Sequence, residues 1–329
     1  MALPESLEAR AFLDLENALT LTLLRSHAPA GDPVLEDILE AVEDDRDGDA
    51  LDRVNDITIQ PAVEKHTRAI QTIGLAAILF GAQRALGRRG QTSFQAEGTR
   101  PEQLQQSADF MSDMVIGTFS TVVQERARNL INQLSLFRQI GDTTGGNLRP
   151  ESTSPVFLPG AAPASPERLG QQFRAFMLQA RDDAVTIASS LHVSRLASWG
   201  FVSEAERLGI EFYEVDEVLD RRTCPVCRQM DGKVFPVPEA RLRLEFLFAQ
   251  SEAGAQTMRN IAPWPRQDRE SISRMRRMSD DELLRNGWAI PPYHPKCRGV
   301  VKRTTKTPRD IGAQAPIGGL NGLLQGIFG

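Results

Sequence analysis

The chain has 329 residues, enough for two modest domains with hydrophobic cores of their own. Aromatic residues make up only 6% of it, while Ala, Leu, Arg, Glu and Gln are abundant, so the composition favours helix over sheet. The net charge of −5 is unevenly spread: residues 1–60 hold fifteen acidic and four basic side chains, whereas residues 221–310 hold nineteen basic and ten acidic ones. This asymmetry indicates either different partners for the two regions or solvated surfaces of opposite sign.

The sequence lacks the signatures of secretion, of a bilayer span and of several enzyme classes. Residues 1–5 have neither the basic start nor the apolar core of a signal peptide. The most apolar run, residues 73–80, is too short to cross a bilayer and continues into Gln83 and Arg84. Nucleophile-elbow, phosphate-loop and dinucleotide-binding fingerprints are absent. We therefore expect a protein made in a cytoplasm, without a membrane span and without these enzymatic activities.

Residues 1–140 are predicted to form a helical N-terminal region. Residues 4–27 carry apolar side chains at helical spacing, namely Phe12, Leu15, Leu19 and Leu23. A short second helix is predicted at 34–42. Residues 43–49 carry acidic side chains at alternate positions, as a calcium-binding loop does. An EF-hand loop with Gly48 at its sixth position would, however, have Val54 at its twelfth position, where a calcium-binding Glu is required. A solvated acidic turn is the better prediction there.

Two long helices are predicted at residues 57–88 and 101–140. The second carries an apolar stripe typical of a core-facing surface, formed by Phe110, Met114, Val122, Leu130, Leu134 and Phe137. Residues 141–166 are rich in Gly, Pro, Ser and Thr, so they are predicted to be a linker or an extended arm. A helix is predicted to begin near Pro166 and to break at Trp199-Gly200.

The remaining chain predicts a small α+β unit over residues 167–305 and a flexible tail or docking peptide over 306–329. Strands are expected at residues 210–219, 233–237 and around Val300. Residues 238–259 and 266–286 are predicted to be mostly helical, and Ser279-Asp-Asp-Glu282 has the pattern of a capping box. The fold class predicted for the whole chain is mainly α with a small α+β C-terminal unit that contains a β-hairpin.

Three cysteines and one histidine form two ligand pairs. Cys224-Pro-Val-Cys227 is followed by Asp231-Gly232, and His294-Pro-Lys-Cys297 begins after a separation of 66 residues from Cys227. Zinc prefers four N or S ligands in a tetrahedron, and pairs two residues apart on tight turns supply them two at a time. We predict one zinc ion bound by these four side chains. Because they would fill the coordination sphere, the ion is expected to be structural.

Other interpretations of these cysteines remain open. The thiols could bind no metal, or Cys224 and Cys227 could be a redox pair; such a pair is expected to open a helix in a βαβ unit, whereas Asp231-Gly232 predicts a hairpin turn. Cysteine knuckles also occur in HNH-type nucleases. That chemistry needs a further histidine as general base, but His294 is the only histidine between residues 193 and 329. The sequence therefore argues against a nuclease of this type.

The motif also resembles a known family. The string from Asp220 to Phe235, with its Cys-Pro-Val-Cys and Asp-Gly, followed by Pro-Pro-Tyr-His-Pro-Lys-Cys-Arg, is similar to the head morphogenesis domain of tailed bacteriophages, found in Mu F-like and SPP1-type minor head proteins. The resemblance covers about residues 165–305. The chain departs from the family pattern at Gly299, where many members have a further Cys, and at Arg181-Asp-Asp, where many have Arg-Thr-Glu.

The resemblance implies a function. Such a protein would be a minor capsid component, located in the head interior or at the portal vertex of the virion. It would bind the portal protein and other head proteins, act in head assembly or genome delivery without catalytic residues, and oligomerise only in the assembled particle. The basic cluster Arg266, Arg269, Arg274, Arg276 and Arg277 could contact packaged DNA or an acidic protein face. The alternative is a zinc-stapled nucleic-acid-binding protein or an HNH-like nuclease.

Overall fold

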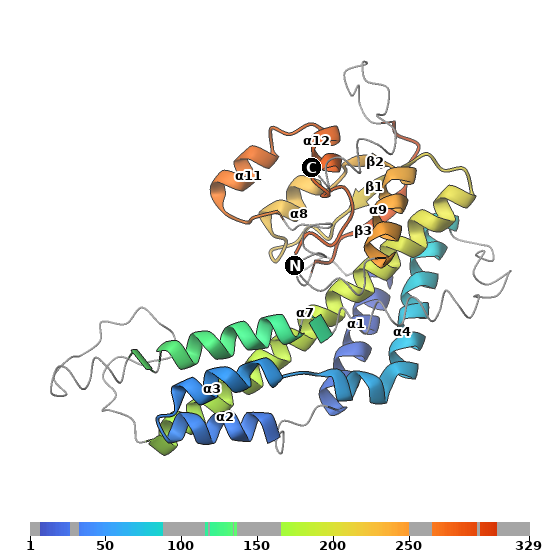
Figure 1. Ribbon diagram of the computed structural model, residues 1–329. Helices are drawn as coiled ribbons and strands as arrows, with labels where there is room; N and C mark the ends of the chain where they lie inside the picture. The colour runs from blue at the N-terminus through green and yellow to red at the C-terminus, as the bar shows by residue number, and fades with distance from the viewer. Residues whose placement is uncertain are drawn as a thin grey trace.

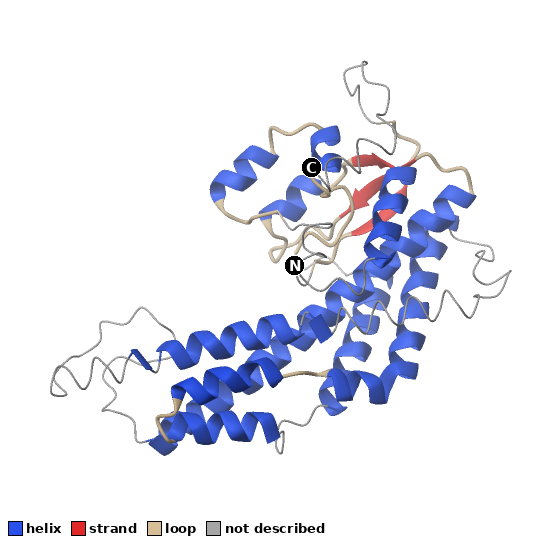
Figure 2. Cartoon of the chain, in the orientation of Figure 1, coloured by secondary structure: helices blue, strands red, loops and turns tan. Residues whose placement is uncertain are grey.

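The computed structural model shows a mainly helical chain with one small β-sheet near its C-terminal end (Figures 1 and 2). The described residues are 7–26, 33–87, 116–117, 119–133, 135–136, 166–249, 265–294 and 297–307. The predicted fold class is confirmed at this level. The predicted linker at 141–165 and the tail beyond residue 307 lie outside the described residues.

The N-terminal helices lie where the apolar spacing places them. They are α1 (Leu7–Ser26), α2 (Pro33–Glu43), α3 (Asp47–Arg53), the 3-10 turn η1 (Val54–Asp56) and α4 (Gln60–Leu86). Helix α1 buries Phe12, Leu19 and Leu23, each no more than 2% exposed. In the predicted acidic turn, Arg46 pairs with Asp44 at 3.2 Å and with Asp49 at 3.1 Å, and all three side chains are largely solvated. Residues 44–46 form the solvated turn, whereas residues 47–49 of the predicted turn begin helix α3.

The predicted helix over 101–140 is described only in part. Residues 116–117, 119–133 and 135–136 are helical, and within them Leu130 is buried and Val122 packs against the same core. The other predicted stripe residues, Phe110, Met114, Leu134 and Phe137, lie outside the described residues.

The longest helix, α7 (Pro166–Arg207), corrects the prediction of a break at Trp199-Gly200. Gly200 serves helix packing here: a Cβ at this position would lie 2.1 Å from the carbonyl oxygen of Ile78, and one at Gly81 would lie 1.8 Å from that of Ala197. The two glycines therefore let the backbones of α4 and α7 approach each other closely (Figure 1). The helix ends before Gly209, whose φ of +68° suits glycine.

Helix α7 contributes to both hydrophobic cores of the described chain. Up to Ala197 its buried residues pack with α1, α2 and α4, and from Phe201 onward they pack with the sheet and the C-terminal helices. Helix α7 thereby connects the helical body to the C-terminal unit (Figure 1).

By length and composition alone, one stretch of the described chain, Asp47–Leu86, could cross a membrane, because an 18-residue window within it has a mean hydropathy of 1.3. In this structure 39% of that window is buried inside the protein. Ile70, Ala77 and Ile78 of α4 belong to the main core, as the apolar side chains of a core helix do.

The C-terminal unit contains a three-stranded antiparallel sheet of order β2-β1-β3. The strands are β1 (Phe212–Asp216), β2 (Val234–Pro236) and β3 (Val300–Arg303), which confirms the predicted hairpin and the strand around Val300. Strand β1 is central and is covered on both faces: Tyr213 and Val215 are fully buried, and Glu214 is nearly so. The sheet thus places the end of β1 beside the start of β3, where Asp216 pairs with Val300.

The described part of this unit also contains the helices α8 (Pro225–Met230), α9 (Val237–Ala249), α11 (Arg269–Met275) and α12 (Asp280–Arg285). Helix α9 covers the described half of the predicted 238–259 helix. The predicted capping box before α12 is confirmed, because the Ser279 hydroxyl accepts from the Glu282 amide and the Glu282 carboxylate accepts from the Ser279 amide.

Candidate metal centre

The first ligand pair lies where the chain leaves β1 and enters α8. Cys224 is the N-cap residue of this helix, and its Sγ accepts a hydrogen bond from the Cys227 amide at 3.3 Å. Pro225 occupies the first helical turn, where its missing N–H is not needed. The Cys-x-x-Cys segment therefore opens a short helix, and the predicted Asp231-Gly232 turn follows it, with a φ of +74° at Gly232. The strands on either side form an antiparallel hairpin, and not the βαβ unit of a redox pair.

The second ligand pair lies in a loop held against the core. The Cys297 amide donates to the His294 carbonyl at 3.2 Å, which closes a turn between the two ligands. The Ser198 hydroxyl of α7 donates to the carbonyl of Pro291 at 3.2 Å. Tyr293 is 1% exposed and anchors the loop in the core. Helix α7 thus fixes the loop that carries His294 and Cys297.

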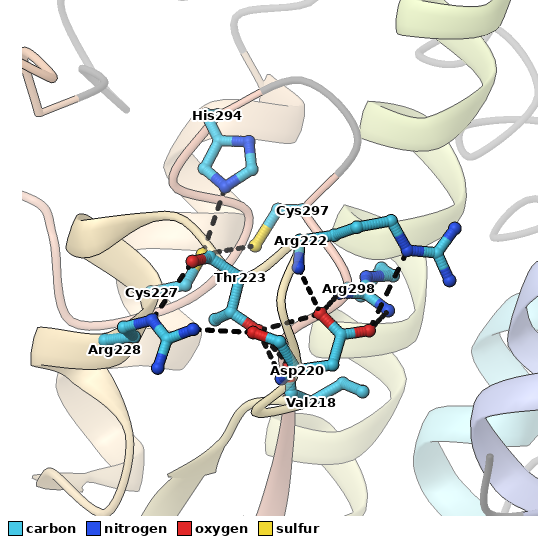
Figure 3. Close-up of polar contacts among 9 residues, drawn as sticks. All are labelled: Val218, Asp220, Arg222, Thr223, Cys227, Arg228, His294, Cys297 and Arg298. Atoms are coloured by element: carbon cyan, nitrogen blue, oxygen red, sulfur yellow. Dashed lines mark hydrogen bonds and ion pairs between the residues drawn. The ribbon is translucent and has the colours of Figure 1, made fainter. Parts of the chain in front are cut away.

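These elements bring the predicted donors together (Figure 3). Cys227 Sγ lies 3.0 Å from His294 Nε2 and 3.8 Å from Cys297 Sγ. The donor atoms of Cys224, Cys227 and His294 all lie within 4.8 Å of one another. The four predicted residues are therefore close enough to bind one metal ion.

The separation between Cys227 and Cys297 agrees with metal binding and excludes a disulfide in this structure. A disulfide would bring the sulfurs to about 2.05 Å. Two thiolates bound at about 2.3 Å to a tetrahedral zinc ion lie roughly 3.8 Å apart. The 3.8 Å between the two sulfurs is close to that distance, whereas the 3.0 Å between Cys227 Sγ and His294 Nε2 is shorter than the roughly 3.5 Å expected for a sulfur and a nitrogen bound to one tetrahedral ion.

The electrostatics of the two buried thiols also fit a cation. The hydrogen bond from Cys227 lowers the pKa of Cys297, while the same bond, together with burial, raises the pKa of Cys227. Two thiols this close share one proton, because two adjacent negative charges in a buried site repel each other. A divalent cation would remove that conflict and allow both sulfurs to ionise.

One donor was missed by the sequence analysis. Glu217, just after β1, is 9% exposed, and its Oε1 lies 3.9 Å from Cys297 Sγ. Its carboxylate, Cys227 and Cys297 form a second group of donor atoms within 4.8 Å. Burial raises the pKa of Glu217 to about 9, and the neighbouring Cys297 adds to the effect. Glu217 lies seven residues before Cys224 and has no motif spacing that could have identified it.

An ion pair connects the two ligand segments outside the donor cluster. Asp220, four residues before Cys224, accepts from both Arg298 guanidinium nitrogens at 2.7 and 2.8 Å, and Arg298 follows Cys297 directly (Figure 3). The bidentate Arg298 contact holds the pKa of the Asp220 carboxyl well below its usual range. Asp220 therefore joins the segment before Cys224 to the segment after Cys297.

Two further residues of the motif stabilise the same loop. The Asp220 amide donates to the Thr223 hydroxyl at 2.7 Å, and the Thr223 hydroxyl in turn donates to the Val218 carbonyl. Asp231 keeps the simpler role expected of a turn residue, since its Oδ1 accepts from the Glu217 amide at 3.0 Å. The loop that carries Cys224 is thus ordered by its own polar side chains.

Comparisons with protein-family models, with curated proteins and with solved structures found no match to this chain. The arrangement of the site is consequently the main structural guide to function. Its chemistry is that of a cluster of thiol and imidazole donors close enough to bind one metal ion.

Proposed function

We propose that this chain is a minor head protein of a tailed bacteriophage, located in the head interior or at the portal vertex of the virion. It would act in head assembly or genome delivery by binding the portal and other head proteins. Its C-terminal unit would hold one structural zinc ion through Cys224, Cys227, His294 and Cys297. We assign it no catalytic residues.

The observation that carries this proposal is the convergence of the two halves of the motif. Asp220 and Thr223 meet Arg298 in one group of contacts, and the first cysteine pair meets His294 and Cys297 in another, across 66 intervening residues. The same residues carry the resemblance to head morphogenesis domains. Contacts between the two halves of the motif favour a real family relation over a chance match of two short strings.

A structural role for the ion follows from the ligands and from the size of the unit. With four protein donors, no position is left open for a water nucleophile. The sheet has strands of five, three and four residues, so the unit depends on few regular hydrogen bonds. An ion that joins two distant loops would supply folding free energy that this small sheet lacks.

The proposal is tested by quantitative mass spectrometry of purified particles of the phage that encodes the chain. We expect a low, fixed copy number relative to the portal and major capsid proteins. Absence of the chain from particles, together with its abundance in infected-cell extract, would contradict a virion role and indicate an assembly factor or an enzyme.

The exposed arginines favour a second candidate, a zinc-stapled nucleic-acid-binding protein. The side chains of the basic cluster Arg266, Arg269, Arg274, Arg276 and Arg277 are all exposed around α11. Such a cluster would attract phosphates and give salt-dependent binding. Gel-shift titration with duplex DNA at two salt concentrations tests this candidate function. Binding that weakens as the salt concentration rises would support it, and a lack of binding at low salt would contradict it.

A further inference from the structure

We propose that the Glu217 carboxylate is an additional ligand of the ion at this centre. The inference rests on the metal site proposed above and goes beyond its four Cys and His ligands. It follows from the position of the carboxylate, from the space around it and from the absence of a cation beside it in the described residues.

The position of Glu217 is that of a donor. Its carboxylate and the sulfurs of Cys227 and Cys297 all lie within 4.8 Å of one another, and Cys227 also belongs to the group formed with Cys224 and His294. An ion held between the sulfurs of Cys227 and Cys297 would therefore have the Glu217 carboxylate within reach as a further donor. Carboxylate oxygens bind zinc at about 2.0–2.2 Å.

The surroundings of Glu217 call for a cation. The side chain is about nine-tenths buried, and none of the described Lys or Arg residues forms an ion pair with it. Cys297 Sγ lies 3.9 Å from its Oε1. A buried carboxylate is stable when it is protonated or when it binds a cation, and a metal ion at Cys227 and Cys297 would supply that cation.

A glycine keeps the space for this carboxylate open. A Cβ at Gly299 would lie 2.1 Å from Glu217 Oε1 and 2.5 Å from its carboxyl carbon. The backbone beside Cys297 and the Glu217 carboxylate thus pack directly against each other, which aims the carboxylate at the sulfurs. Any larger residue at Gly299 would push it away.

Glu214, which lies in β1 three residues before Glu217, provides a matched control. It is 7% exposed, but its carboxylate meets Lys306 at 2.7 Å and Lys302 at 3.6 Å on the other side of β1. Two glutamates three residues apart are thus both buried, one among lysines and one among thiols. Only the second is in a position to bind the ion.

The substitution Glu217→Gln distinguishes two roles of Glu217, that of a metal ligand and that of a protonated hydrogen-bond partner of Cys297. Gln has the same shape as Glu and can donate a hydrogen bond to Cys297, but it binds zinc poorly. We expect zinc affinity, measured by competition with a chromophoric chelator on the full chain, to fall at least tenfold in Glu217→Gln. Gly299→Ala should lower it as well, and Glu214→Gln should leave it unchanged. The visible d–d bands of bound cobalt should change in Glu217→Gln and stay the same in Glu214→Gln.

A second pair of variants keeps the test valid if Glu217→Gln folds poorly. With Glu217 as an extra ligand, Cys224→Ser should still bind one ion per chain, and Cys224→Ser/Glu217→Gln should not. Wild-type affinity and an unchanged cobalt spectrum in Glu217→Gln would overturn the inference while leaving the metal centre intact. Failure of the wild-type chain to bind zinc or cobalt would instead overturn the metal centre itself.

Discussion

At the scale of single residues, side chains outside the donor cluster hold the candidate metal centre together. Asp220 and Arg298 join the segment before Cys224 to the segment after Cys297 through a bidentate pair. Such outer contacts orient the ligands and contribute to metal affinity through them. Asp220 also explains why the motif extends beyond its four donors.

The substitution Asp220→Asn tests this role. The amide cannot form the charged bidentate pair, so the two ligand loops should lose part of their alignment. We expect zinc affinity to fall about 10- to 100-fold, as for outer-contact residues in other metal sites. Asp49→Asn, which breaks an exposed ion pair with Arg46 in the N-terminal part, is the control and should leave affinity unchanged. Equal zinc affinity in Asp220→Asn and wild type would show that the pair is not needed.

At the scale of elements, the close crossing of α4 and α7 sets the geometry of the helical body. Gly81 and Gly200 face the backbone of the partner helix, so neither position has room for a methyl group. A side chain there would separate the helices along the interface that buries Ile78 and Ala197. Because α7 also carries Ser198, which holds the second ligand loop, a shift of this helix would reach the metal centre.

The crossing predicts an inversion of ordinary helix propensity. Alanine is a better helix former than glycine by about 1 kcal/mol, yet Gly81→Ala and Gly200→Ala should each lower the free energy of unfolding by about 1–3 kcal/mol through overpacking. Gly48→Ala is the control, because Gly48 lies in α3 and an added methyl group there would have no heavy atom within 4 Å. Chemical denaturation of the three variants measures the differences. Stabilisation by Gly200→Ala would contradict the close approach.

At the scale of the whole molecule, α7 belongs to two cores with different sources of stability. The first core is formed by long helices, whereas the second combines a small sheet, short helices and the metal centre. Removal of the ion should therefore act on one part of the molecule and spare the other. The cysteine and histidine donors belong to the second core and its loops.

Hydrogen exchange in the presence and absence of a strong chelator tests this division. On chelation we expect faster exchange in β1, α8 and β3, because metal binding supplies folding free energy to this unit. Amides of α1 and of the first half of α7 should keep their protection. Uniform loss of protection throughout the chain would indicate a single cooperative unit, and no change would show that the ion contributes little to folding.

Much of this architecture could be predicted from the sequence because its signals are local. Apolar spacing located α1, α2 and α4, Ser279 and Glu282 located a helix start, and the paired donors located the candidate centre. The exceptions depend on contacts between distant segments. Gly200 resembles a helix breaker until Ile78 is placed against it. Glu217 resembles an ordinary residue after a strand until Cys297 is brought beside it.

The zinc content of the purified full-length chain tests the central claim most directly. Inductively coupled plasma mass spectrometry should find about one zinc per chain. Cys227→Ser should lose the ion, since Cys227 belongs to both groups of donors, and Cys297→Ser should behave alike. A folded wild-type chain that contains no metal and takes up none when zinc is supplied would contradict the account.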